Sequence, residues 1–221
     1  MLCLIGSVLS IAMPPFGGIY SSQFRSRGYY FSSPIEMWLV GARMGAELGD
    51  GRSILDVVYI NGAPDTFPEE TSATSLFYYN RTDLNTQSPN WICIKPTLYI
   101  SPRTFYGFLG GRVSDEETGN MSYSYSTTNE FTTQANGNPI TLYRLMNQQS
   151  IFNAKTTFVS TDREEPLARI ELYFTYQEPT SLPDYCQNVP PNPDDNPNIT
   201  TTNQPNQEKN TSPASIISIL F

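Results

Sequence analysis

The chain has 221 residues, no histidine, 15% charged and 13% aromatic residues, and a formal net charge of −8. The absence of histidine excludes catalytic triads with an imidazole base, zinc sites that need imidazole ligands, and histidine-based pH switches. An acidic chain without a basic run also lacks the charge pattern that nucleic acid or an anionic membrane surface requires. The length suits one β domain with a tail.

Residues 1–15 begin with an apolar, uncharged run that two prolines end. The run is shorter than the roughly 20 apolar residues of a membrane span. Its length, and the small residues Ser10 and Ala12 before a cleavage point after Ala12, predict a secretion signal, although no Lys or Arg precedes it. A buried first strand is the alternative.

Residues 16–182 predict an all-β domain. They show no sustained 3.6-residue period, and their short runs of Val, Ile, Tyr, Phe and Thr are separated by Gly, Pro, Asn and Asp. Strands are expected at 29–31, 35–44, 54–60, 75–80, 91–94, 97–100, 105–109, 121–127, 140–146 and 169–176. Their number and spacing predict a two-sheet antiparallel β-sandwich of jelly-roll type.

Some positions in this domain carry more specific predictions. The strand 35–44 is apolar on both faces, so we expect it to be central, with Trp38 in the core. Gly49, Asp50 and Gly51 indicate a hairpin before the next strand. In the strand 169–176, apolar and polar residues alternate, which predicts one core face and one solvated face. The pair Gly110–Gly111 indicates a bulge or a tight turn.

Residues 183–221 form a segment dense in Pro, Asn and Thr, with almost no residue able to anchor a core. We therefore predict a disordered tail. It ends in the apolar hexapeptide Ile216–Phe221, which is shorter than the apolar part of a lipid-anchor signal. A truncated anchor, a strand donated to a neighbouring molecule and an inert end all remain open.

Cysteine and asparagine positions predict covalent modifications. Removal of the first segment leaves Cys93 and Cys186, an even pair that predicts a disulfide in an extracellular chain. The alternative is a buried Cys93 and an unrelated thiol at Cys186. Candidate N-glycosylation sequons begin at Asn80, Asn120, Asn198 and Asn210. Their number is close to chance in a chain so rich in Asn, Ser and Thr.

Several stretches, taken in order, carry a resemblance to a recurring exported domain. They are Arg27–Pro34, Leu39–Arg43, Ser53–Val58, Pro64–Pro68, Ser75–Tyr78, Gly107–Arg112, Ser122–Ser124, Thr141–Leu145 and Arg169–Tyr173. This order resembles uncharacterised secreted bacterial β-sandwich domains, often found in proteins with a PEP-CTERM-type surface-sorting signal. The resemblance spans about residues 17–176 and implies export and a sandwich, with no catalytic residues. The tail departs from the sorting pattern, because it lacks the Pro-Glu-Pro motif, the apolar span and the terminal basic residues.

Carboxylate pairs are the hydrolytic machinery that needs no histidine. The candidates are Glu36, Asp56, Glu171 and the cluster 115–117; Asp56 stands out because it lies between Leu55 and Val57. We expect it to be a solvated residue on a strand face. The cluster lacks the alternating acidic pattern of a calcium loop, and 107–111 lacks the Lys-Ser/Thr of a phosphate loop. We therefore predict no catalytic residues, no metal site, no cofactor and no enzymatic activity.

Aromatic residues indicate binding, because sugar rings stack on exposed Tyr and Trp side chains. The candidate ligand-binding residues are Trp91, Tyr106, Tyr123 and Tyr125. Tyr123 and Tyr125 lie two apart among serines, so they share one strand face and form the best candidate pair. The alternative is that the tyrosines fill the half-buried rows of the sandwich.

The sequence therefore predicts a secreted or surface-exposed, non-enzymatic β-sandwich that acts as an adhesive, carbohydrate-binding or matrix module. Its expected partners are glycans or copies of itself, with no nucleic acid and no membrane span. The alternative is a structural subunit of an extracellular or viral assembly that uses its apolar termini for subunit contacts. A carboxylate-based glycoside hydrolase is the third hypothesis.

Overall fold

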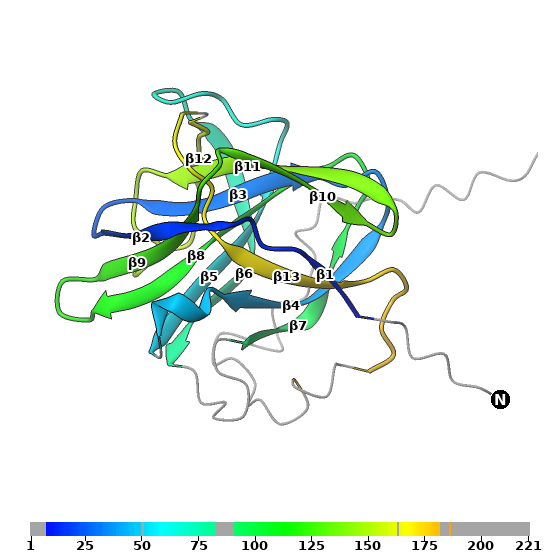
Figure 1. The fold of residues 1–221 in the computed structure, drawn as a ribbon, viewed down its shortest axis with the longest axis horizontal. Coiled ribbons are helices and arrows are strands. Elements are labelled where there is room, and N and C mark those ends of the chain that lie inside the picture. The colour runs from blue at the N-terminus through cyan, green and yellow to red at the C-terminus, as the bar shows by residue number, and fades with distance from the viewer. Residues whose placement is uncertain (1–7, 50, 83–90, 163, 182–185, 187–221) are drawn as a thin grey trace, which may run out of the picture.

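The computed structural model describes residues 8–49, 51–82, 91–162, 164–181 and 186, and it confirms the all-β prediction. Within these ranges, thirteen strands form two antiparallel sheets that pack together as a sandwich (Figure 1). No helix of the described part is long and apolar enough to cross a bilayer. Apart from Cys186, the predicted tail 183–221 lies outside the described residues.

The smaller sheet has the strand order β1-β13-β4-β7. Its strands are β1 (Leu9–Ile11), β4 (Met37–Met44), β7 (Trp91–Ile100) and β13 (Ile170–Thr175). The central place of β4 is the one predicted from its two apolar faces. The two strands expected at 91–94 and 97–100 form the single strand β7, because β7 is an edge strand, where the missing N–H of Pro96 is tolerated.

The larger sheet has the order β10-β11-β3-β8-β5-β6-β12; β9 also pairs with β8, and β2 pairs with β9. Its strands are β2 (Phe16–Ser22), β3 (Ser26–Ser32), β5 (Arg52–Ile60), β6 (Thr71–Thr82), β8 (Phe105–Asp115), β9 (Asn120–Ser126), β10 (Glu130–Ala135), β11 (Asn138–Asn147) and β12 (Phe158–Val159). The expected hairpin at 49–51 is wrong, because β4 and β5 belong to different sheets and the short 3₁₀ helix η1 (Ala46–Leu48) lies between them.

The main core lies between the two sheets and follows from strand alternation. In β13, Ile170, Leu172 and Phe174 are buried in this core, while Glu171 and Tyr173 are only half-buried. The first strand joins the same core: β1 pairs with β13, and Ile11 is 2% exposed. The N-terminal apolar run therefore supplies a core residue in this structure.

A second core covers the other face of the larger sheet. Ile151 and Val159, from the segment 148–161, pack there against Ile54, Val58 and Leu109. The central strands of the larger sheet are consequently buried on both faces, whereas an ordinary antiparallel sandwich leaves one face of each sheet wet. Side chains on this face of the larger sheet, among them that of Tyr123, are therefore buried.

The glycine pair at 110–111 marks close packing and not the predicted bulge or turn, because the β5–β8 register runs through it without a shift. A Cβ atom at Gly110 would lie 2.7 Å from the Met44 Cε atom, and one at Gly111 would lie 2.6 Å from the Ser122 carbonyl oxygen. Both contacts are too close for a side chain. Glycine is therefore needed here for the approach of neighbouring strands and side chains.

Candidate functional site

The outer face of the smaller sheet carries two aromatic pairs, which we call the aromatic face: Trp38 with Tyr99, and Trp91 with Tyr173. The register places Trp38 opposite Tyr99 on neighbouring strands. The ring centroids of Trp38 and Tyr99 are 5.1 Å apart, and those of Trp91 and Tyr173 are 4.1 Å apart. All four side chains are half-buried, so each presents part of its surface at the face.

The local sequence explains this placement. Met37 and Leu39 are fully buried in the main core, so Trp38 between them must face outward. Ile92 is likewise a core residue, which turns the neighbouring Trp91 outward. Both tryptophans of the chain therefore lie on the outer side of the smaller sheet. The expectation that Trp38 lies in the core is wrong for this reason.

Charged side chains lie among these rings. The Arg43 guanidinium forms an ion pair with the Glu171 carboxylate and lies 5.4 Å from the centre of the Trp91 ring. At the other pair, the Tyr99 hydroxyl donates a hydrogen bond of 3.1 Å to Glu36 Oε2, and this contact raises the pKa of Tyr99 in addition to the larger effect of desolvation. The face thus combines apolar ring surface with donors and acceptors of both charges.

The predicted disulfide between Cys93 and Cys186 is present and lies on this side of the sheet. Its Cα atoms are 5.5 Å apart, and the bridge joins β7 to Cys186, the described residue of the tail region. Lys95 Nζ, two residues after Cys93 on the same strand face, donates a hydrogen bond of 2.7 Å to the Cys186 carbonyl oxygen. The bridge therefore attaches the start of the tail beside the aromatic face.

Three of the four sequence-predicted ligand residues lie elsewhere. Tyr123 is fully buried in the second core, so the prediction that it forms an exposed pair with Tyr125 is wrong. Tyr125 is half-buried beneath β2, where its hydroxyl would lie 2.4 Å from a Cβ atom at Gly18. Tyr106 is 3% exposed and its hydroxyl is hydrogen-bonded to Ser101 in the core. Of the predicted set, Trp91 alone belongs to the aromatic face.

Asp56 is buried and not solvated as the sequence predicted. Its side chain lies on the sheet face that the segment 148–161 covers, and both carboxylate oxygens accept hydrogen bonds: Oδ1 from the Ser75 hydroxyl at 2.7 Å and Oδ2 from the Thr156 amide at 2.6 Å. Burial raises the pKa of Asp56 to about 6, against the opposing effect of these hydrogen bonds. Because both oxygens accept hydrogen bonds and the side chain is buried under the covering segment, the carboxylate is poorly placed to attack a substrate.

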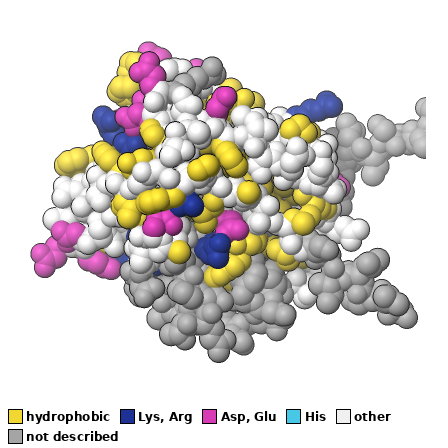
Figure 2. Space-filling view, in the orientation of Figure 1, with side chains coloured by type: hydrophobic (Ala, Val, Ile, Leu, Met, Phe, Trp, Pro, Cys, Tyr) yellow, Lys and Arg dark blue, Asp and Glu magenta, His cyan; other side chains and the backbone are white. Residues whose placement is uncertain are grey.

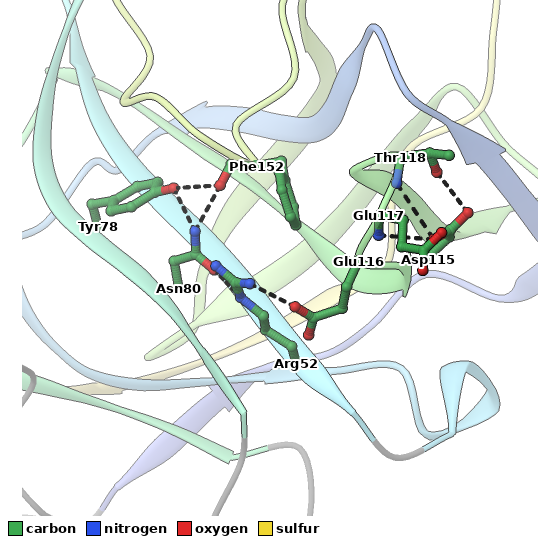
Figure 3. A network of polar contacts seen from close by, with 8 residues as sticks. All are labelled: Arg52, Tyr78, Asn80, Asp115, Glu116, Glu117, Thr118 and Phe152. Atoms are coloured by element: carbon green, nitrogen blue, oxygen red, sulfur yellow. Dashed lines mark hydrogen bonds and ion pairs between the residues drawn. The ribbon is translucent and has the colours of Figure 1, made fainter.

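A second polar network fastens the same segment (Figure 3). Asn80 Nδ2 donates to the Phe152 carbonyl oxygen at 2.7 Å and to the Tyr78 hydroxyl at 3.0 Å. Its Oδ1 accepts from Arg52 Nε at 2.6 Å, and Arg52 also pairs with Glu116 at 2.9 Å. A glycan on Asn80 would replace one of the two Nδ2 hydrogens, so at least one of these donated hydrogen bonds would be broken.

Of the three other sequons, the structure describes only the one at Asn120. Asn120 begins β9 and is half-buried; Asn198 and Asn210 lie outside the described residues.

In the loop 115–118, Asp115 Oδ2 accepts a hydrogen bond from the Thr118 hydroxyl, and Oδ1 accepts hydrogen bonds from two backbone amides. These bonds lower the pKa of Asp115, with the Thr118 hydroxyl as the largest cause. Among the described residues, no group of three or more Cys, Asp or Glu side chains is placed to hold a metal ion.

An ion cluster with two buried arginines and a half-exposed glutamate, which sequence reasoning missed, lies at another end of the main core. Arg144 and Arg27, on the paired strands β11 and β3, both pair with Glu165 Oε2, at 2.6 and 2.8 Å. Desolvation is the largest cause that lowers the pKa of Arg144, followed by the charge of Arg27. The cluster ties the segment around Glu165 to the larger sheet. Alternation along β11, in which Arg144 follows Ile140 and Leu142 on one face, was the signal for its burial.

Comparison with known proteins adds no relative: no protein-family model matches the sequence, and no curated protein matches it. The candidate site is therefore defined by geometry alone.

Proposed function

We propose that the protein is an exported, non-enzymatic β-sandwich that binds carbohydrate through its aromatic face. The observation that supports this proposal is that both tryptophans of the chain, each paired with a tyrosine, lie half-buried on the outer side of one sheet. Aromatic side chains on a rigid sheet are preformed stacking surfaces for the apolar faces of sugar rings, and binding to them needs little ordering of side chains.

The polar side chains of the face suit the rest of a sugar. Glu36 accepts a hydrogen bond from Tyr99, and the Arg43 guanidinium, a donor, lies over the Trp91 ring. Glu171, a further acceptor, pairs with Arg43. Sugar hydroxyls are both donors and acceptors, so mixed charges serve them better than a face of one sign. A ligand would stack on a ring and exchange hydrogen bonds with the charged group beside it.

The disulfide supports the export part of the proposal. Disulfides persist in oxidising compartments and are rare in the cytosol, and this chain joins its only cysteines outside the first segment in one bridge. The resemblance to exported β-sandwich domains points the same way.

The test is retention of the purified full chain on a glycan array and on insoluble cellulose, chitin and xylan. We expect retention on at least one of these, and we expect Trp38→Ala to weaken it at least tenfold, about 1.4 kcal/mol of binding free energy. Trp38 is suited to this test because its outward ring can be removed without opening the main core.

The matched control is Phe67→Ala, which removes an exposed aromatic ring (44% exposed) away from the aromatic face. This variant should bind as the wild type does. An array without a retained glycan, or equal weakening by both variants, would overturn the proposal.

A further inference from the structure

Strand β2 is an edge strand without the features that prevent edges from pairing with other chains. Within the described part of the chain it pairs with β9 only, which leaves the backbone groups of its second edge without a strand partner. The strand contains no charged residue and no proline. An edge of this kind is a template for the addition of another strand.

The other edge strands of the described sheets have features that oppose pairing with another chain. β7 contains Lys95 and Pro96, and β10 begins with Glu130. β1 and β12 have three and two residues, respectively, and the free part of β6 carries Arg81. Charges, prolines and short length are the usual devices against edge-to-edge pairing. Among these strands, β2 is therefore the one suited to pairing between molecules.

Four large apolar side chains on or next to β2 are exposed, and arginines lie over two of their rings: Arg27 is 3.9 Å from the centre of the Tyr20 ring and Arg169 is 5.4 Å from that of Phe16. Phe16, Ile19, Tyr20 and Phe24 are 51%, 49%, 39% and 74% exposed. Figure 2 shows hydrophobic side chains gathered over the part of the molecule that β2 occupies in Figure 1. With aromatic side chains that can bury roughly 150–250 Å² each, these four residues expose on the order of 400 Å² of apolar surface per molecule.

A second copy of the chain fits this edge better than a charged partner does. An antiparallel pair of identical strands satisfies its own backbone groups about a two-fold axis, and the uncharged strand offers no ion-pairing group to a charged peptide. Two copies with a net charge of −8 each repel one another, and the electrostatic cost of contact is lowest at an uncharged edge. Two patches of this size, with the flanking backbone and serines, come near the roughly 1,200 Å² lower limit of specific interfaces.

We propose that β2 pairs antiparallel with β2 of a second copy and so extends the larger sheet across two molecules. The pairing uses the regular stretch 18–22, because the β2–β9 register shifts between Phe16 and Gly18. The interface is small, so the dimer is weak, and added salt tightens it by screening the repulsion between the two acidic chains. This proposal does not depend on sugar binding.

Sedimentation equilibrium of the full chain over a series from roughly 1 µM to 1 mM tests the proposal. We expect a monomer–dimer equilibrium in the wild type. Ile19→Lys should raise the dimer dissociation constant at least tenfold, because a lysine on the edge must be desolvated next to its symmetry mate. Since Ile19 is half exposed, this substitution leaves both cores intact.

Phe158→Lys is the matched control, because Phe158 is 48% exposed on β12 and lies outside the proposed interface. It should dimerise as the wild type does. Amide hydrogen exchange of residues 16–24 should also slow as the wild-type concentration rises and stay constant in Ile19→Lys. Three results would overturn the proposal: a wild-type monomer at every concentration, an equal change in the dissociation constant by Ile19→Lys and Phe158→Lys, or an exchange rate of residues 16–24 that does not depend on concentration.

Discussion

The buried carboxylate of Asp56 links the larger sheet to the segment 148–161 that covers its outer face. Its two oxygens hold the Ser75 hydroxyl of β6 and the Thr156 amide of the covering segment. Burial favours the neutral acid, and the pKa of Asp56 rises from 3.8 to about 6. A carboxyl group whose pKa is raised by folding stabilises the fold fully below its unfolded pKa and loses that contribution as the pH rises through the folded value.

The first prediction is therefore a stability that falls between about pH 4 and pH 6.5 because of Asp56. A shift of about two pKa units corresponds to a loss of up to roughly 3 kcal/mol of unfolding free energy across this range. Asp56→Asn should remove this loss, since a neutral amide can donate to the Ser75 oxygen and accept from the Thr156 amide without titrating. Urea denaturation at a series of pH values measures both proteins.

The control for this prediction is Asp65→Asn, an exposed aspartate that also accepts a threonine hydroxyl, from Thr71. Its pH profile should keep the wild-type fall. A wild-type profile parallel to that of Asp56→Asn across pH 4 to 6.5 would show that this carboxylate is not perturbed.

At the scale of elements, the segment 148–161 behaves as a lid on the outer face of the larger sheet. It buries Ile151 and Val159 and is fastened by Asp56 and by the amide of Asn80. The lid explains why the polar-looking strand β9 carries the buried Tyr123. Its loss would expose the second core while leaving the main core between the sheets intact.

The second prediction concerns this fastening. Asn80→Ala removes two donated hydrogen bonds and one accepted from Arg52, in a half-buried site. We expect a loss of about 1–2 kcal/mol of unfolding free energy and faster amide exchange in residues 148–157. The exposed Asn61, in the turn after β5, provides the control Asn61→Ala, which should change neither quantity. An Asn80→Ala protein as stable as the wild type would contradict the network drawn in Figure 3.

The third prediction concerns the bridge between β7 and the tail. Cys93 and Cys186 are 93 residues apart in sequence, and the chain-entropy model assigns a loop of this length about 4–5 kcal/mol. The double variant Cys93→Ala/Cys186→Ala should lose stability of this order in guanidinium denaturation. Cys3→Ala should have no effect, and equal stability of all three proteins would contradict a structural role for the bridge.

Much of the element pattern could be predicted from the sequence, because strand alternation and turn residues are local signals. Strands such as β4, β5 and β13 were visible in this way, whereas β2 was missed because its glycines and serines weaken the pattern. Strand order was beyond prediction, since pairing depends on contacts far apart in the chain. Thus Gly49–Gly51 indicated a turn but gave no sign that the next strand lies in the other sheet.

At the scale of the whole molecule, the same reason limits the prediction of the site. The spacing of Tyr123 and Tyr125 placed them on one strand face, but only the lid decides that this face is buried. Trp38 lies in a strand that is apolar on both faces, so the sequence did not show that its ring points outward, and it did not show that Trp38 and Trp91 gather on one sheet. The finished molecule presents two distinct surfaces, the aromatic face of the smaller sheet and the edge of β2 in the larger one.

The most direct test of the central claim uses tryptophan fluorescence, because both tryptophans of the chain lie on the aromatic face. The full chain is titrated with the soluble oligosaccharide that it retains best on the array. We predict a saturable change in emission and reduced quenching by acrylamide. The oligosaccharide concentration at the midpoint of both changes should rise at least tenfold in Trp38→Ala and stay the same in Phe67→Ala. An emission spectrum that no retained oligosaccharide alters, or an array that retains none, would contradict sugar binding at this face.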